Sequence, residues 1–138
     1  MEFKIEKLSG FTMVQVLKEK LDTHIAPSLK SELVLLSGNG ERNILLDLSH
    51  SNYCDSSGLS AILVANRLCK NSEGVFVLSG LLPAVERLIT VSQLDSVLNI
   101  APNAEEGVAL MNRLLLNSWF DAVFINCIGK QLRSAYVR

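Results

Sequence analysis

One segment of the sequence concentrates side chains that could do chemistry. Residues 47–59 read Asp-Leu-Ser-His-Ser-Asn-Tyr-Cys-Asp-Ser-Ser-Gly-Leu, and Asp55-Ser56-Ser57-Gly58 within it opens a run with helical spacing. Asp and Ser are preferred helix N-caps, which satisfy backbone N–H groups that have no partner in the helix. The same position attracts negative charge, so it also suits a phosphate attached to a serine. The residues alone leave both interpretations open, a cap or a phosphate acceptor.

These residues do not compose the active site of an enzyme. No Gly-x-Ser-x-Gly elbow surrounds Ser56, and the chain has no glycine-rich phosphate loop of the Walker or Rossmann type. His24, His50 and three cysteines lack the spacing of a metal site, so we expect neither a metal nor a cofactor. We therefore expect that the protein is not an enzyme.

Length and composition limit the remaining classes of protein. A chain of 138 residues with 49% apolar and 20% charged residues can bury one core, so we expect one folded domain. A net charge of −1 argues against binding to nucleic acid or anionic lipid. No apolar run approaches the roughly 20 residues needed for membrane insertion. The odd number of cysteines predicts reduced thiols, and the expected location is the cytoplasm.

Hydropathy periods predict the elements that must position the segment. Alternation with a period of two predicts strands over 3–8 and 11–17, joined by a Ser-Gly turn as an antiparallel pair. Short, continuous apolar runs predict three further strands, at 43–48, 75–78 and 97–100. Helical spacing predicts four helices, over about 25–36, over 57–70, from Pro83 and from residue 103. The predicted fold is α/β, with a mixed, mainly parallel sheet of four to five strands, an N-terminal antiparallel hairpin and about four helices.

Three short segments follow one another in a familiar order. Asp55-Ser56-Ser57-Gly58-Leu59 comes after an apolar strand, Leu21-Asp22 enters the first predicted helix, and residues 78–85 join a strand to a helix opened by Pro83. In this order they resemble the motifs of the STAS domain family, whose founding members are bacterial anti-sigma factor antagonists. The resemblance spans about residues 3–116. The expected organisation is a STAS domain over 1–117, followed by a C-terminal extension over 118–138.

The resemblance implies a phosphorylation switch. In the family's antagonists the first serine of the signature is phosphorylated by a partner that is both anti-sigma factor and serine kinase. Here that residue is Ser56, with Ser57 the less favoured acceptor. The unphosphorylated protein would bind the anti-sigma factor and the phosphorylated protein would be released, and a cognate phosphatase is a further expected partner. The implied partner-binding residues are Asp22, Asp55, Ser56, Ser57, Gly58 and Leu59.

Two alternatives and one departure accompany this interpretation. A small cytoplasmic STAS subunit of an ABC-type lipid transport system would use the same fold to bind an ATPase subunit. A stress-signalling scaffold would assemble many copies of it. The chain departs from the family where Glu19-Lys20 replaces a Gly-Glu pair before Leu21, so the turn into the first helix is expected to differ.

The C-terminal extension carries a helical apolar stripe through Phe120, Phe124, Ile128 and Leu132. We expect a further helix packed on the domain, or a strand-like extension. A self-association surface, and hence a homodimer, is the second interpretation, because an isolated apolar stripe needs burial. Membrane docking is less favoured, since the segment has few cationic residues.

Overall fold

The computed structural model describes the backbone of residues 2–136 and the side chains of residues 2–119 and Val123. Its elements follow in the order β1 (Phe3–Leu8), β2 (Phe11–Val16), β3 (Lys20–Leu21), α1 (Ala26–Gly38), β4 (Ile44–Asp47), β5 (Tyr53–Cys54), α2 (Ser56–Asn71), β6 (Phe76–Ser79), α3 (Pro83–Val91), a 3-10 turn η1 (Leu94–Ser96), β7 (Asn99–Ala101) and α4 (Ala104–Tyr136). Each helix and strand predicted within residues 3–117 is present, with ends displaced by a few residues.

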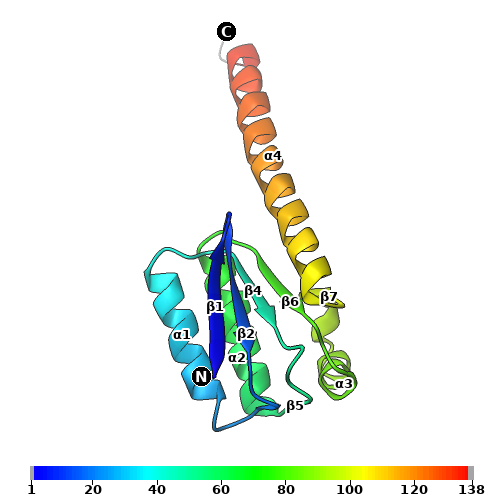
Figure 1. Ribbon diagram of the computed structural model, residues 1–138. Helices are drawn as coiled ribbons and strands as arrows, with labels where there is room; N and C mark the ends of the chain where they lie inside the picture. The colour runs from blue at the N-terminus through cyan, green and yellow to red at the C-terminus, as the bar shows by residue number, and fades with distance from the viewer. Residues whose placement is uncertain (1, 137–138) are drawn as a thin grey trace.

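One mixed sheet forms the centre of the protein (Figure 1). Its five strands lie in the order β1-β2-β4-β6-β7. β1 and β2 form an antiparallel hairpin, and each following neighbour pairs in parallel. Together with the four helices of the described residues, this confirms the predicted α/β fold. Sequence periodicity missed a second, two-stranded sheet formed by β3 and β5.

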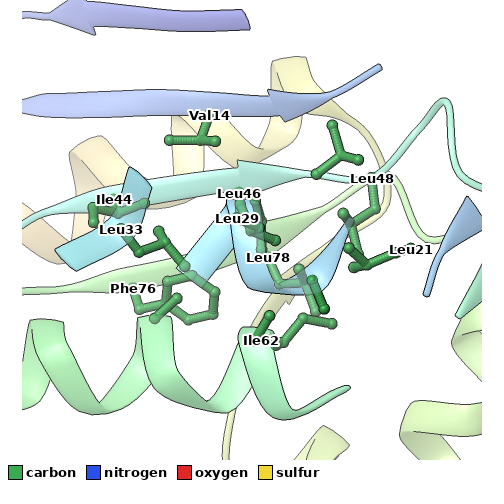
Figure 2. Packing of buried hydrophobic residues seen from close by; sticks show 14 of the residues in the cluster. Val14, Leu21, Leu29, Leu33, Ile44, Leu46, Leu48, Ile62, Phe76 and Leu78 are labelled. Carbon is green, nitrogen blue, oxygen red and sulfur yellow. The ribbon is translucent and has the colours of Figure 1, made fainter. Parts of the chain in front are cut away.

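Strands β4 and β6 are buried on both faces, which explains their continuous apolar runs. Ile44 and Leu46 of β4 contribute to the larger core, on the side covered by α1, α2 and α3, whereas Leu45 contributes to the opposite side. Figure 2 shows this larger core, in which side chains from α1 and α2 meet those of the strands. Leu21 and Leu48 lie at one end of it, so the segments that follow them are anchored by buried apolar side chains.

Helix α4 covers the second face of the sheet with its first part only. Met111 is fully buried there, beside the half-buried Leu114 and Leu115. Beyond these residues the helix continues without a break past residue 117 and projects away from the sheet (Figure 1). The side chains of the predicted stripe, Phe120, Phe124, Ile128 and Leu132, lie outside the described side chains.

Candidate functional site

The predicted site lies where the chain passes from β5 into α2, and a small parallel sheet builds it. Lys20 pairs with Tyr53 and Leu21 with Cys54, so two segments distant in sequence run side by side. The backbone N–H of Asn52 donates to the Glu19 carbonyl at 2.8 Å. These bonds attach the loop before α2 to the segment before α1.

A buried carboxylate fixes the start of the same loop. Asp47, at the end of β4, is fully buried. Its Oδ2 accepts hydrogen bonds from Ser49 Oγ at 2.6 Å and from Gln15 Nε2 at 3.1 Å, and its Oδ1 accepts one from Ser79 Oγ at 3.0 Å. Three donors replace the water that a buried carboxylate has lost. The loop therefore leaves the sheet from a polar anchor shared by β2, β4 and β6.

A second buried hydroxyl holds the middle of the loop. Ser51 is fully buried, and its Oγ donates to the carbonyl of Lys18 at 2.7 Å. Its backbone N–H donates to the Leu48 carbonyl at 3.0 Å, which closes a turn. The path of residues 48–55 is thus set by hydrogen bonds at its beginning, middle and end.

Asp55 is the N-cap of α2. Its Oδ1 accepts hydrogen bonds from the backbone N–H groups of Ser57 at 2.9 Å and Gly58 at 3.0 Å. The N–H of Leu59 donates to the Asp55 carbonyl at 2.9 Å. The side chain of Asp55 therefore satisfies two of the donors that a helix start leaves without partners, and its carbonyl accepts the first bond of the helix.

Gly58 permits the close approach of α2 to β3. It is buried, and a Cβ atom at this position would collide with the carbonyl oxygen of Leu21 and lie 2.7 Å from the Sγ of Cys54. The glycine of the signature is therefore required by packing beneath the helix. It lies on the inner side of α2, not on the outer surface.

Ser56 is the first residue of α2, and its side chain is exposed. The side-chain hydrogen bonds described at this helix start use Cys54, Asp55 and backbone groups, and none uses the Ser56 hydroxyl. Ser57 is half-buried, and Leu59 is half-buried against the larger core. Of the consecutive residues 55–59, Ser56 is the one that is exposed.

Asp22 lies beside this helix start and begins the path into α1. It directly follows Leu21, as Asp55 directly follows the paired Cys54. Its Oδ1 accepts from the backbone N–H of His24 at 3.0 Å, and its carbonyl accepts from the N–H of Ala26 at 2.8 Å. Two carboxylates thus directly follow the paired strands of the small sheet. Asp22 also lines a surface depression with Lys18, Glu19, Lys20, His24 and Ile25.

The thiol of Cys54 lies next to this helix start. Burial, followed by the charge of Asp55, raises the pKa of the Cys54 thiol to about 12. Only the thiolate attacks or binds metal, so this raised pKa disfavours a reactive Cys54. Among the described residues, no group of three His, Cys, Asp or Glu side chains could hold a metal ion. In the same part of the chain, no helix is both long and apolar enough to cross a membrane.

The structure brings the sequence-predicted residues together on two neighbouring segments, with Asp22 on one and residues 55–59 on the other. Sequence reasoning missed the roles of Asp47 and Ser51. A signal for Asp47 was available, because a carboxylate that ends a continuous apolar strand is placed for burial and needs hydrogen-bond donors. Ser51 had no such signal, since its partner is a backbone carbonyl distant in sequence.

Comparison with known proteins places this geometry in a family. The STAS domain family model matches residues 2–107. BtrV of Bordetella bronchiseptica, a candidate anti-sigma factor antagonist, is 27% identical over 115 residues, which are 83% of this chain and 98% of BtrV.

Solved structures share the fold at lower sequence identity. An anti-sigma factor antagonist from Mycobacterium paratuberculosis superposes with a TM-score of 0.72 at 21% identity, covering 80% of this chain and 92% of that one. Unphosphorylated SpoIIAA superposes with a TM-score of 0.64 at 18% identity, over 80% and 97% of the two chains. Phosphorylated Bacillus SpoIIAA gives 0.63 at 19%, over 78% and 96%. Because the family model matches residues 2–107, this chain belongs to the STAS domain family.

Proposed function

We propose that this protein is an anti-sigma factor antagonist, controlled by phosphorylation of Ser56. The unphosphorylated form binds an anti-sigma factor that is also a serine kinase, and phosphorylation releases it. A cognate phosphatase restores the binding form. The observation that carries the proposal is the Ser56 hydroxyl, exposed at the start of α2 and outside the hydrogen bonds described there.

The hydrogen bonds of Asp55 explain why a phosphate would act on the partner and spare the fold. The N–H groups of Ser57 and Gly58 already bind the Asp55 carboxylate. A phosphate on Ser56 therefore adds roughly −1.5 to −2 charges at the surface, beside a carboxylate that already occupies the helix terminus. Because Ser56 is exposed, no packed side chain has to move. The added charge faces the docked partner.

The binding surface that we propose comprises Ser56, the exposed part of the helix start and the neighbouring Asp22. The exposed parts of Ser57 and Leu59 belong to this binding surface. Gly58 is buried and only shapes the turn beneath the surface. A bound partner must desolvate this surface, so a new, uncompensated phosphate costs binding energy. A loss of about 3 kcal/mol weakens binding by more than a hundredfold.

Two relatives support the proposal. BtrV, the relative with 27% identity, is a candidate anti-sigma factor antagonist. SpoIIAA, which shares the fold, has structures in an unphosphorylated and a phosphorylated form. In our proposal the present chain is a substrate and binding protein of the cytoplasm, and ATP and magnesium belong to the kinase. We place the STAS domain in residues 1–117 and the extension in 118–138.

The proposal is tested by phosphorylation and binding measured on the same variants. The protein is incubated with ATP, Mg²⁺ and each anti-sigma factor kinase of its organism, and labelled residues are located by mass spectrometry. We expect a single phosphate on Ser56, no label on Ser56→Ala, and unchanged labelling of the matched control Ser57→Ala. Ser56→Asp should bind the kinase about a hundredfold more weakly than wild type.

Two results would overturn the proposal. The first is the absence of label on Ser56 with every such kinase. The second is a folded Ser56→Asp variant that binds the kinase as tightly as wild type.

A further inference from the structure

The projecting part of α4 presents apolar side chains that the domain does not cover. The exposed fractions of Leu116, Trp119 and Val123 are 63%, 63% and 49%. These residues are spaced three and four apart, so they lie along one side of the helix. Other apolar residues of α4, such as Met111 and Leu115, already cover the sheet. The exposed stripe therefore lies beside the residues that cover the sheet, and Trp119 borders a surface depression that it shares with Arg42, Asn43, Glu73 and Val75.

We propose that this stripe, Leu116, Trp119 and Val123, is a self-association surface and that its occupant is the same stripe of a second copy of the chain. Spacing of three and four residues is the pattern of a helix that packs along a second helix. A stripe on one helix can meet its own copy across a two-fold axis, which requires no other complementary surface. The proposal does not depend on the phosphorylation switch.

Charge favours a second protein helix over a lipid surface as the occupant. Between Arg113 and Lys130 the sequence contains a single charged residue, Asp121. Helices that lie on membranes carry Lys and Arg along their polar side, and this stretch has none. Two copies of an almost uncharged stripe can approach without repulsion or loss of ion pairs.

The length of the projection limits how strong the association can be. From Leu116 to the end of α4 at Tyr136 the helix extends about 30 Å at roughly 1.5 Å per residue. The contact is confined to one side of one helix, so we expect its area to lie at or below the lower end for specific interfaces, about 1,200 Å². We therefore expect a dimer with a dissociation constant on the order of 1–100 µM.

The position of the stripe keeps the proposed switch accessible. α4 runs back along the sheet and projects beyond the end near the β1–β2 hairpin, whereas β5 and the start of α2 lie at the opposite end (Figure 1). A dimer joined through α4 would hold two copies of Ser56 away from the contact. Dimerisation and phosphorylation are therefore expected to be independent.

Sedimentation velocity of the full chain, from about 1 to about 200 µM, tests this proposal. Wild type should shift from monomer to dimer as its concentration rises. The variant L116Q/W119Q/V123Q should raise the dissociation constant by about a hundredfold or more. The matched control V34Q/L35Q/V91Q changes apolar residues with exposed fractions of 55%, 61% and 75% elsewhere on the domain, and should dimerise as wild type does. Circular dichroism establishes that both variants are folded.

Three results would overturn the proposal. One is a monomer at every concentration. Another is a dimer that the stripe variant does not weaken relative to the control. The third is a monomeric protein that floats with phosphatidylcholine–phosphatidylglycerol vesicles through the same three residues, which would identify a lipid surface as the occupant.

Discussion

The Oδ1 of Asp55 accepts a hydrogen bond from the backbone N–H of Gly58 at 3.0 Å, which makes Asp55 the cap of α2 and leaves Ser56 outside the cap. The residue types alone allow this segment to be a helix cap or a phosphate acceptor. The cap is Asp55, and the acceptor that we propose is its neighbour Ser56. The carboxylate fulfils the structural requirement of the helix start. The adjacent hydroxyl is exposed and has no part in the cap, so it can be modified at little cost to the fold.

Removal of this cap should destabilise the protein by a modest amount. Asp55→Ala leaves the N–H groups of Ser57 and Gly58 without their acceptor, which typically costs about 1 kcal/mol. Asp55→Asn keeps an acceptor oxygen and should recover most of that loss. Urea unfolding measures both changes. Equal destabilisation by Ala and Asn would show that the charge of Asp55, and not its cap, contributes the stability.

Addition of one methyl group at Gly58 should be more damaging. A Cβ there would collide with the Leu21 carbonyl and lie 2.8 Å from the Leu21 Cγ, so α2 must move away from β3. We expect Gly58→Ala to cost about 1–3 kcal/mol, although alanine is the better helix former. Gly38→Ala is the matched control, because no atom lies within 4 Å of its added Cβ. The control should be neutral or stabilising by up to about 1 kcal/mol, and a Gly58→Ala protein as stable as this control would contradict the packing argument.

The anchor at Asp47 should be sensitive to loss of a single acceptor. Asp47→Asn leaves one oxygen where two oxygens now accept from Gln15, Ser49 and Ser79, so at least one of these donors faces an amide N–H. The expected destabilisation is about 1–3 kcal/mol, measured by chemical unfolding. Ser79→Ala, which removes a single donor, should cost less. A fully stable Asp47→Asn protein would show that water or a rearranged loop replaces the lost bond.

Much of the fold could be predicted because the hydropathy periods of the sequence follow directly from which side chains are buried. Ile44, Leu45 and Leu46 form a continuous run since each face of β4 is covered, by α1 and α2 on one side and by α4 on the other. Glycine, proline and alternation marked the turns and the hairpin. These signals are local, so they can be recognised in the sequence without knowing which segments pack together.

The site was only partly predictable, because its construction depends on contacts between distant segments. β3 and β5 contain two residues each, too few to show any period, and their pairing is visible only in three dimensions. Asp55 and Ser56 are both common cap types, so residue preference could not decide which of them accepts from the Gly58 N–H. Helical spacing continued past residue 117, but no signal in the sequence showed that this segment prolongs α4 and does not form a further helix packed on the domain.

Alkaline pH should reveal the burial of the two described thiols. The pKa of Cys69 is raised to about 12, chiefly by burial, and that of Cys54 is raised to about 12 by burial and by the charge of Asp55. The ordinary value is 9.0. In the unfolded chain the thiols therefore lose their protons first, so stability is intact below pH 9 and falls as the pH rises from 9 towards 12.

Lysine and tyrosine side chains titrate over the same pH range, so the contribution of the thiols has to be isolated by substitution. We expect the free energy of unfolding of wild type to fall more steeply between pH 9 and 11 than that of Cys54→Ala/Cys69→Ala, although the variant starts lower because it has lost buried atoms. Parallel curves over this range would show that neither thiol is shielded from solvent. Iodoacetamide should then also modify both cysteines of the native protein at pH 8, whereas shielded thiols would react only after unfolding.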